Sequence, residues 1–271
     1  MELIFELKDV SYRYPQGNTG LKDVTLSIGR GERVTILGAN GSGKSTLLNI
    51  LDALLFPTAG CLYAFGEPIT DDGIKNNRTL IDFRKRVSLI FQDSNIQLFS
   101  PTVWDDIAFG PLQMNIDSED IFKRVDDVMV MLGIRHLKDR APHTLSSGEK
   151  KKVAIASSLA INPDVILLDE PTSGLDPRTQ VWLIELLEEL HTAGKTLISA
   201  THDLSIVEDI SDRVAVLAEN HTIAIIGSPD EVLSNRDLLL KVNLIHEHAH
   251  RHGGVFHTHS HGHFAGHDHE H

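Results

Sequence analysis

The chain contains 271 residues, of which 41% are hydrophobic and 23% are charged, with 20 glycines and 10 prolines. This is the composition of a folded globular protein, and it excludes a wholly disordered or fibrous chain. The 25 lysines and arginines against 38 acidic residues give a net charge of −13, which repels a phosphate polymer, so we expect no nucleic-acid partner.

The composition also indicates a compartment. The single cysteine, Cys61, cannot form an internal disulfide, and the opening residues MELIFELKDV lack the basic and apolar parts of a secretory signal. No apolar run reaches the roughly 18 residues that a membrane helix needs. We therefore expect a protein of the reducing cytoplasm, either soluble or held at a membrane by a partner.

The N-terminal region predicts an antiparallel sheet with one face in water, because apolar residues alternate there with polar ones. They are Leu3, Phe5, Leu7, Val24, Leu26 and Ile28. Farther along, short apolar and β-branched runs predict strands, and the middle runs are continuous enough to be buried on both faces, as in a largely parallel sheet. They lie at 33–37, 87–91, 165–168, 196–200, 214–218 and 222–226.

Helical patterns separate the strands of this second group. Apolar residues recur at helical spacing over 121–132, and another helix is predicted over 177–193, with Asp176 as its N-cap. Strands that alternate with helices predict an α/β fold. Few strand signals occur between about 95 and 160, so we expect a helical insert in the α/β core. The expected domain covers residues 1–240, followed by a flexible histidine-rich tail over 241–271.

A glycine-rich loop follows the strand RVTIL. Residues 38–45 read GANGSGKS and precede the helical run TLLNILDALL, which fits the pattern G-x-x-x-x-G-K-S in its required context, although a ligand-free turn is the alternative. Glycines let backbone N–H groups surround phosphate oxygens, Lys44 reaches the β- and γ-phosphates of ATP, and the Ser45 hydroxyl can ligate Mg²⁺. The expected phosphate-binding residues are Gly38, Ala39, Asn40, Gly41, Ser42, Gly43, Lys44, Ser45 and Thr46.

Two acids end the buried run VILLDE at 165–170, where packing alone would favour an apolar residue. We expect Asp169 to hold Mg²⁺, directly or through water, and Glu170 to polarise the water that attacks the γ-phosphate. By themselves, two acids at a strand end could simply be solvated. The phosphate loop favours the catalytic interpretation.

With these motifs the chain resembles the ATP-binding subunits of ABC transporters over about residues 1–240. The segment LSSGE at 145–149 is similar to the family signature LSGGQ, with Ser147 in place of a glycine and Glu149 in place of the glutamine. Ser146 and Glu149 also fit a capping box at the start of a helix. The resemblance implies an α/β fold with a RecA-like phosphate-loop core. It also implies that Ser146 and Gly148 bind the γ-phosphate of ATP held on another subunit.

Further roles come from the resemblance alone. Gln92 matches a glutamine that senses Mg²⁺ or the lytic water, and His202 matches a switch histidine that contacts the γ-phosphate. Asp176 matches a residue of the loop between two ATP-binding domains. Tyr14 matches the aromatic that stacks on adenine, with Tyr12 as the competing candidate. The catalytic set is then Glu170, His202, Gln92 and Lys44, and the magnesium set is Ser45, Gln92 and Asp169.

Other phosphate-loop ATPases fit less well. ABC proteins of DNA repair insert long coiled coils between loop and signature, but no sustained heptads occur here. The soluble translation-factor branch carries two ATP domains in one chain, and this chain has room for one. The resemblance therefore implies a peripheral subunit at the cytoplasmic face of the cell membrane. Its partners would be integral membrane subunits and a second ATP-binding subunit, either a copy or a paralogue.

The segments QLFSPTV at 97–103 and DIAFGP at 106–111 resemble energy-coupling-factor ATPases, especially those of cobalt and nickel uptake. By this resemblance, the segment after Gln92 docks a membrane subunit through apolar residues. The alternative is that these residues belong to the core of the helical insert. They are Ile96, Leu98, Phe99 and Trp104.

The tail carries residues that bind metals. Only five of the 16 histidines precede residue 245, and the others recur at alternate positions near the C-terminus. Imidazole without thiolate suits Ni²⁺, Co²⁺, Zn²⁺ or Cu²⁺, although a solvated tail that binds metal incidentally is the alternative. The expected ligands are His246, His248, His250, His252, His257, His259, His261, His263, His267, His269 and His271.

Together these features predict an ATPase that powers the import of nickel or cobalt, with ATP and Mg²⁺ as cofactors and Ni²⁺ or Co²⁺ at the tail. Import, as opposed to export, rests on the resemblance alone. Zinc uptake is one alternative, and vitamin uptake by a coupling factor with an adventitious tail is another. From a different class, the chain could be a cytosolic ATP-dependent metal chaperone or sensor with no membrane partner.

Overall fold

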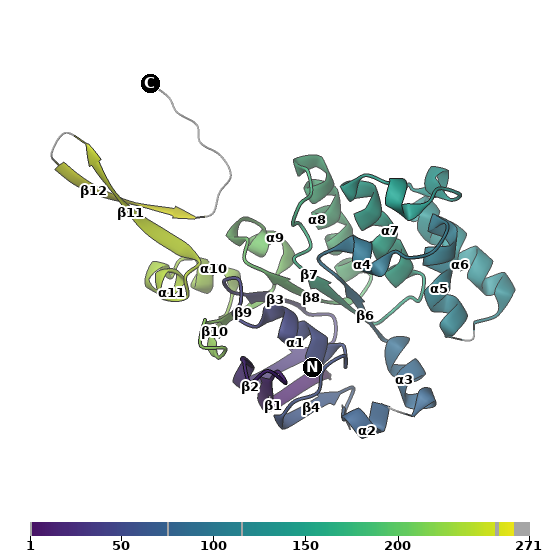
Figure 1. Cartoon of the computed structure of the whole chain (residues 1–271), viewed down its shortest axis with the longest axis horizontal. Coiled ribbons are helices and arrows are strands. Elements are labelled where there is room, and N and C mark those ends of the chain that lie inside the picture. Colours follow the sequence, from purple (N-terminus) through teal and green to yellow (C-terminus); the bar gives the residue numbers. More distant parts are fainter. Residues whose placement is uncertain (1, 75, 115, 253–254, 263–271) are drawn as a thin grey trace.

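A computed structural model describes residues 2–74, 76–114, 116–252 and 255–262 of the chain. Two sheets and a group of helices form the body, and a hairpin extends from it on the side away from the helical insert (Figure 1). The expected fold class is confirmed, since the chain combines an α/β core, an N-terminal antiparallel sheet and an inserted helical region.

The N-terminal sheet has the strand order β2-β1-β4-β5, and all its neighbours are antiparallel. Leu7 pairs with Leu26, and Val10 pairs with Val24, so the apolar residues of both strands share the buried face. The strands are β1 (Leu3–Arg13), β2 (Thr19–Gly29), β4 (Ala59–Ala64) and β5 (Glu67–Pro68).

The central sheet has the order β10-β9-β3-β8-β7-β6, with only β10 antiparallel to its neighbour. Its strands begin and end within one or two residues of the predicted runs. In chain order they are β3 (Arg33–Leu37), β6 (Val87–Ile90), β7 (Val165–Asp169), β8 (Thr196–Thr201), β9 (Arg213–Leu217) and β10 (Ile223–Gly227).

Helices cover both faces of the central sheet. The α-helices are α1 (Lys44–Leu51), α2 (Asp71–Ile74), α3 (Asn77–Arg84), α4 (Ser94–Gln97), α5 (Val103–Gln113), α6 (Ser118–Met131), α7 (Ser147–Leu159), α8 (Pro177–Thr192), α9 (Val207–Ile210), α10 (Pro229–Leu233) and α11 (Arg236–Lys241). Short 3₁₀ helices lie at Arg135–Leu137, Pro142–Thr144 and Leu204–Ile206. Among the described residues, no helix has both the length and the hydropathy of a membrane span.

The strand β7 shows why the predicted run at 165–168 is apolar throughout. Val165 and Leu167 belong to the core between the central sheet, α1 and the N-terminal sheet. Ile166 and Leu168 belong to the second core, which contains the helices α5 to α8. Both faces of the strand are therefore buried, as the absence of alternation indicated.

The C-terminal segment packs on the body before the hairpin begins. Leu239, Val242 and Leu244 are buried with Val232 of α10 in a third core, so the packed body extends four residues past the expected domain boundary. The strands β11 (Ile245–His252) and β12 (Val255–Gly262) then pair antiparallel. The expected tail ligands His263, His267, His269 and His271 lie outside the described residues.

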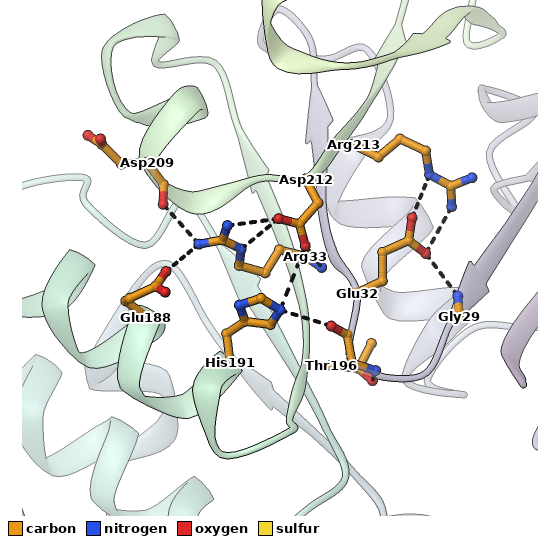
Figure 2. A network of polar contacts seen from close by, with 10 residues as sticks. Gly29, Glu32, Arg33, Glu188, His191, Thr196, Asp209, Asp212 and Arg213 are labelled. Carbon is orange, nitrogen blue, oxygen red and sulfur yellow. Dashed lines mark hydrogen bonds and ion pairs between the residues drawn. The ribbon is translucent and has the colours of Figure 1, made fainter. Parts of the chain in front are cut away.

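A network of charges joins the amino ends of the central strands to α8 (Figure 2). Arg33 at the start of β3 donates to Asp212 (Nη2–Oδ1 2.7 Å) and to Glu188 of α8 (Nη1–Oε2 2.5 Å). His191 of α8 bonds the Gly31 carbonyl (Nε2–O 3.0 Å). The Arg33 side chain is 16% exposed and that of Glu188 is 57% exposed. This network connects β3, β9 and α8 at the amino ends of the strands, opposite the end of β3 that carries the loop 38–45.

Asp52, which follows α1, is a buried acid paired with Arg84 at the end of α3 (Oδ2–Nη1 2.6 Å). Burial raises the pKa of Asp52 from 3.8 to about 6, although the Arg84 charge acts in the opposite direction. The folded protein therefore holds this proton more tightly than the unfolded chain does. Stability from this group is greatest below about pH 4 and is lost as the pH rises through about 6.

Asp52→Asn is expected to remove this part of the pH dependence. Between pH 4 and 7, the free energy of unfolding of the wild type should fall relative to that of the variant by up to about 3 kcal/mol. Urea unfolding at several pH values measures the difference, and Asp127→Asn on the exposed face of α6 is the control. If the free energy of unfolding changes with pH equally in the wild type and in Asp52→Asn, the expectation is wrong.

Candidate functional site

The loop between β3 and α1 is held between the two sheets. The Gly38 N–H donates to the Thr201 carbonyl at the end of β8 (3.2 Å). A Cβ at Gly38 would lie 2.6 Å from the carbonyl oxygen of Leu217, and one at Gly43 would lie 2.3 Å from that of Gly20. Gly43 also has a φ of 111°. These close approaches require glycine, so the pattern that predicts phosphate binding also fits the packing of the loop.

Lys44, the first residue of α1, is buried within this loop. Its Nζ donates to the carbonyl oxygens of Gly38 (2.9 Å) and Ala39 (3.2 Å) and lies 3.2 Å from Oε1 of Glu170. The Lys44 and Glu170 side chains are only 6% and 7% exposed. The structure thus brings the expected phosphate-binding lysine against the expected catalytic acid.

Glu170 is the centre of a second set of contacts. Its Oε1 accepts a hydrogen bond from Nδ1 of His202 (2.9 Å), and its Oε2 accepts one from Oγ1 of Thr201 (3.1 Å). Its φ of 41° lies in the left-handed region, which is unusual for a residue other than glycine and occurs where surrounding contacts enforce it. The carboxylate is therefore fixed in orientation from two places in the chain, by Lys44 of α1 and by Thr201 and His202 at the end of β8.

Asp169 at the end of β7 lies where a cation could bind. Burial raises the pKa of Asp169 above its usual value, while a hydrogen bond with Ser45 acts to lower it. Among the described residues, no group hydrogen-bonds to the buried Oδ1 of Asp169. A carboxylate oxygen without a partner beside a hydroxyl is a donor set that Mg²⁺ accepts. The residues present therefore fit a magnesium ion.

A cavity of about 290 Å³ opens beside the loop. Tyr14 contributes to its wall, and its hydroxyl lies 2.8 Å from Oγ1 of Thr46. Tyr12 is only 9% exposed and packs in the core, so the geometry favours Tyr14 over Tyr12 for contact with a ligand. The expected site residues that line this cavity are Tyr14, Asn40, Gly41, Gly43, Lys44, Ser45, Thr46, Gln92 and Glu170.

The signature residues lie elsewhere. Ser146 caps α7, and the capping box with Glu149 is formed as expected. The Ser146 hydroxyl donates to Oε2 of Glu149 (2.8 Å), and Asp176 caps α8 by accepting from the Thr179 N–H (3.1 Å). Neither Ser146, Gly148 nor Asp176 lines the cavity beside the phosphate loop. Ser146 and Asp176 are exposed, and Gly148 is half-buried beside Thr179 of α8.

The segment after Gln92 divides between core and surface. Leu98 is buried and Trp104 packs against the core of the helical insert, as the alternative interpretation predicted for them. Ile96 and Phe99 are 68% and 66% exposed. Phe99 stacks edge-to-face on Phe109 of α5, with ring centroids 4.9 Å apart. Phe109 and Leu112 are exposed as well, so α4, α5 and the loop between them carry four exposed apolar side chains.

The start of the tail lies close to the phosphate loop. A cavity of about 190 Å³ is bounded by Ala39, Asn40, His202, Glu219 and His246, among others. Sequence reasoning treated the tail as separate from the ATP site. Among the described residues, no cluster of three or more histidine, cysteine or acidic side chains has the arrangement of a metal site. The side chains of the other tail histidines lie outside the described part.

Sequence reasoning missed one buried cation. Lys151 of α7 is 2% exposed, and its Nζ donates to the Phe91 carbonyl (3.3 Å), next to Gln92. Burial lowers the pKa of Lys151 to about 8, while the charge of Asp169 acts to raise it. The position of Lys151 on the predicted helix could have indicated its burial. Lys150 and Lys152, its neighbours in the run, lie on other faces of α7. Thr201 was missed as well, although it directly precedes His202.

A family model described as ABC transporter matches residues 21–173, which is more than half of the chain. The chain therefore belongs to the ABC transporter family, as an ATP-binding subunit. It is an ATPase, and this family uses ATP with Mg²⁺.

Individual relatives agree with this assignment. A putative ABC transporter ATP-binding protein of Methanosarcina acetivorans is 55% identical over 256 residues, covering 93% of each chain. The nickel import ATP-binding protein NikO of Rhodobacter capsulatus is 45% identical, covering 89% of this chain and 95% of that protein. Three archaeal relatives at 39 to 41% identity are named energy-coupling factor transporter ATP-binding proteins.

A solved structure shows the same fold. It is cbiO1 of Clostridium perfringens, described as part of the ABC transporter complex cbiONQ. It superposes with a TM-score of 0.77 at 39% identity, covering 90% of this chain and 96% of that one.

Proposed function

We propose that this chain is the ATP-hydrolysing subunit of a transition-metal importer, with nickel or cobalt as the cargo. The histidine-rich tail carries this proposal, because borderline metals such as Ni²⁺ and Co²⁺ favour imidazole nitrogen. The similarity to a nickel import protein and to cbiO1 supports it. Zinc is the nearest alternative cargo, and a vitamin carried by a coupling-factor transporter is another.

We further propose how the site residues divide the reaction. Loop amides and Lys44 would bind the triphosphate, Tyr14 would stack on adenine, and Ser45, Asp169 and Gln92 would hold Mg²⁺. The metal would neutralise charge on the β- and γ-phosphates when bound. Glu170 would accept a proton from the attacking water, which adds to the γ-phosphorus as the bond to ADP breaks. His202, fixed by Glu170, would contact the phosphate that leaves.

The second ATP-binding subunit would complete this site. Ser146, Gly148 and Asp176 lie away from the loop cavity of their own chain, which supports their use by a neighbouring copy or paralogue. A helix N-terminus such as that of α7 favours an anion. ATP held by one subunit would then lie against α7 of the other.

The membrane subunits would dock on the exposed apolar side chains of Ile96, Phe99, Phe109 and Leu112. The loop that carries Phe99 is held by Asp106, whose Oδ1 accepts from the N–H groups of Phe99 (3.1 Å) and Ser100 (2.9 Å). A fixed presentation of exposed apolar residues suits protein contact. This docking would hold the chain at the cytoplasmic face of the membrane.

A cytosolic metal chaperone or sensor is the candidate from another class, and the position of His246 near His202 is the observation in its favour. Co-purification separates the two. Integral membrane proteins that remain bound to the chain in detergent support the transporter. A chain that purifies alone, with ATP hydrolysis that responds to metal, supports the sensor.

The proposed function is tested by ATP-dependent uptake of Ni²⁺, Co²⁺ and Zn²⁺ into vesicles that carry the complete complex. A tail truncation should follow His246, because a cut after Asn243 would remove Leu244 from the third core. We expect uptake of nickel or cobalt, and truncation should change its rate or its metal dependence at least about twofold.

The control replaces the tail histidines after residue 246 with asparagine, which keeps the length of the chain. If only the truncation changes uptake, the imidazoles are not responsible. If a complex that hydrolyses ATP takes up none of the three metals, the cargo is another substrate and the proposal is wrong.

A further inference from the structure

The turn between β9 and β10 carries a histidine in an unusual conformation. His221 has a φ of 66°, in the left-handed region that glycine adopts without strain. The turn is otherwise tightly held, because the His221 N–H donates to the Ala218 carbonyl (2.9 Å) and its carbonyl accepts from the Lys22 N–H on β2 (2.9 Å). Residues kept in strained conformations often serve a function that the surroundings enforce.

The side chain of His221 reaches the phosphate loop. Its Nδ1 lies 3.1 Å from the carbonyl oxygen of Ser42, across 179 residues of sequence. A carbonyl only accepts, so Nδ1 carries the proton and donates. Ser42 is 1% exposed and sits between Gly41 and Gly43, which have φ values of 83° and 111°. The bond therefore fixes the peptide between Ser42 and Gly43, within a stretch where two glycines have positive φ.

The imidazole also forms part of the wall of the nucleotide cavity, together with Tyr14, Lys44 and Thr46. The turn is thus joined to β2 through its backbone and to the phosphate loop through its side chain. We propose that His221 is a positioning residue for ATP. Its hydrogen bond to Ser42 holds the loop in the conformation in which the amides of the loop face the phosphates.

This inference rests on the proposed assignment of residues 38–46 to phosphate binding. If it is correct, loss of the bond weakens ATP binding because part of the binding energy must then order the loop. The chemical step is unaffected, because His221 is not among the residues that contact Glu170. One neutral hydrogen bond corresponds to about a fivefold change in affinity.

Three variants test separately the imidazole ring of His221, its hydrogen-bond donor and its left-handed backbone conformation. His221→Gly removes the ring and relieves the left-handed strain. His221→Ala removes the ring and keeps the strain. His221→Asn tolerates the left-handed region and places its amide nitrogen where Nδ1 stood. ATP affinity and the thermal midpoint are measured for each on the isolated subunit. KM and kcat for ATP hydrolysis are measured on the complete complex without cargo, so the result does not depend on the cargo.

We expect His221→Gly and His221→Ala to raise the Kd and KM for ATP about fivefold with kcat within about twofold of the wild type. His221→Asn should restore wild-type affinity. The thermal midpoint of His221→Gly should not fall, which separates loop positioning from stability. Unchanged Kd in His221→Gly, or equal loss in His221→Asn, overturns the proposal. Wild-type protein that binds no ATP would instead refute the assignment of the loop itself.

Discussion

Glu170→Gln is expected to retain ATP binding and to lower kcat for ATP hydrolysis by at least about 100-fold. The amide has nearly the shape of the carboxylate, and its oxygen can still accept from Thr201. It cannot take a proton from water, and it no longer neutralises Lys44, which lies 3.2 Å away. The ATP affinity should therefore equal that of the wild type or exceed it, because Lys44 is released from a competing partner.

Equilibrium binding of ATP and steady-state phosphate release measure the two effects separately. Glu185→Gln on the exposed side of α8 is the matched control and should hydrolyse ATP normally. Hydrolysis by Glu170→Gln within tenfold of the wild-type rate would show that Glu170 is not the general base.

Lys44→Ala should abolish detectable ATP binding, with a rise in Kd of about 100-fold or more. Charge-assisted hydrogen bonds to phosphate are among the strongest that a side chain makes. The ammonium also bonds the Gly38 and Ala39 carbonyls, so the variant also loses contacts that shape the loop. Equilibrium binding of ATP to the isolated subunit measures the change.

The variant also leaves Glu170 buried without its cation, and an unpaired buried charge destabilises a fold. The double variant Lys44→Ala with Glu170→Gln separates these effects, since it removes both charges. We expect it to recover the thermal midpoint and to remain unable to bind ATP. Recovery of binding together with stability would mean that Lys44 acts on folding and not on phosphate. Lys123→Ala on the exposed face of α6 is the control for loss of a positive charge.

The strands of the central sheet were predictable because their burial is a property of local sequence. A run such as 165–168 has no polar position, and the structure places its residues alternately in two cores. Caps were predictable for a similar reason, since Ser146 and Asp176 bond backbone groups within three residues. The extent of the packed C-terminal segment was not predictable from local sequence, because Val242 and Leu244 pack with residues of β3 and β9, which are distant in sequence.

The candidate site divides in the same way. The loop at 38–45 and the acids at 169–170 are continuous in sequence, so their pattern is visible without a fold. The contacts that position them are not local: Thr201 and His202 bond Glu170 from more than 30 residues away, and His221 bonds Ser42 across 179. Lys151 is one of three adjacent lysines, and only the rotation of α7 decides which of them is buried.

The network around Arg33 and the pair of Lys44 with Glu170 should respond differently to salt concentration. Mobile ions screen charges that water reaches, with a Debye length of about 10 Å at 0.1 M salt, but they screen buried pairs far less. Glu188 and Asp212 are 57% and 40% exposed, against 6% and 7% for Lys44 and Glu170. Ionic strength therefore acts on one end of the parallel strands more than on the other. Added salt would loosen the connection between β3, β9 and α8 while leaving the electrostatics of the Lys44–Glu170 pair nearly unchanged.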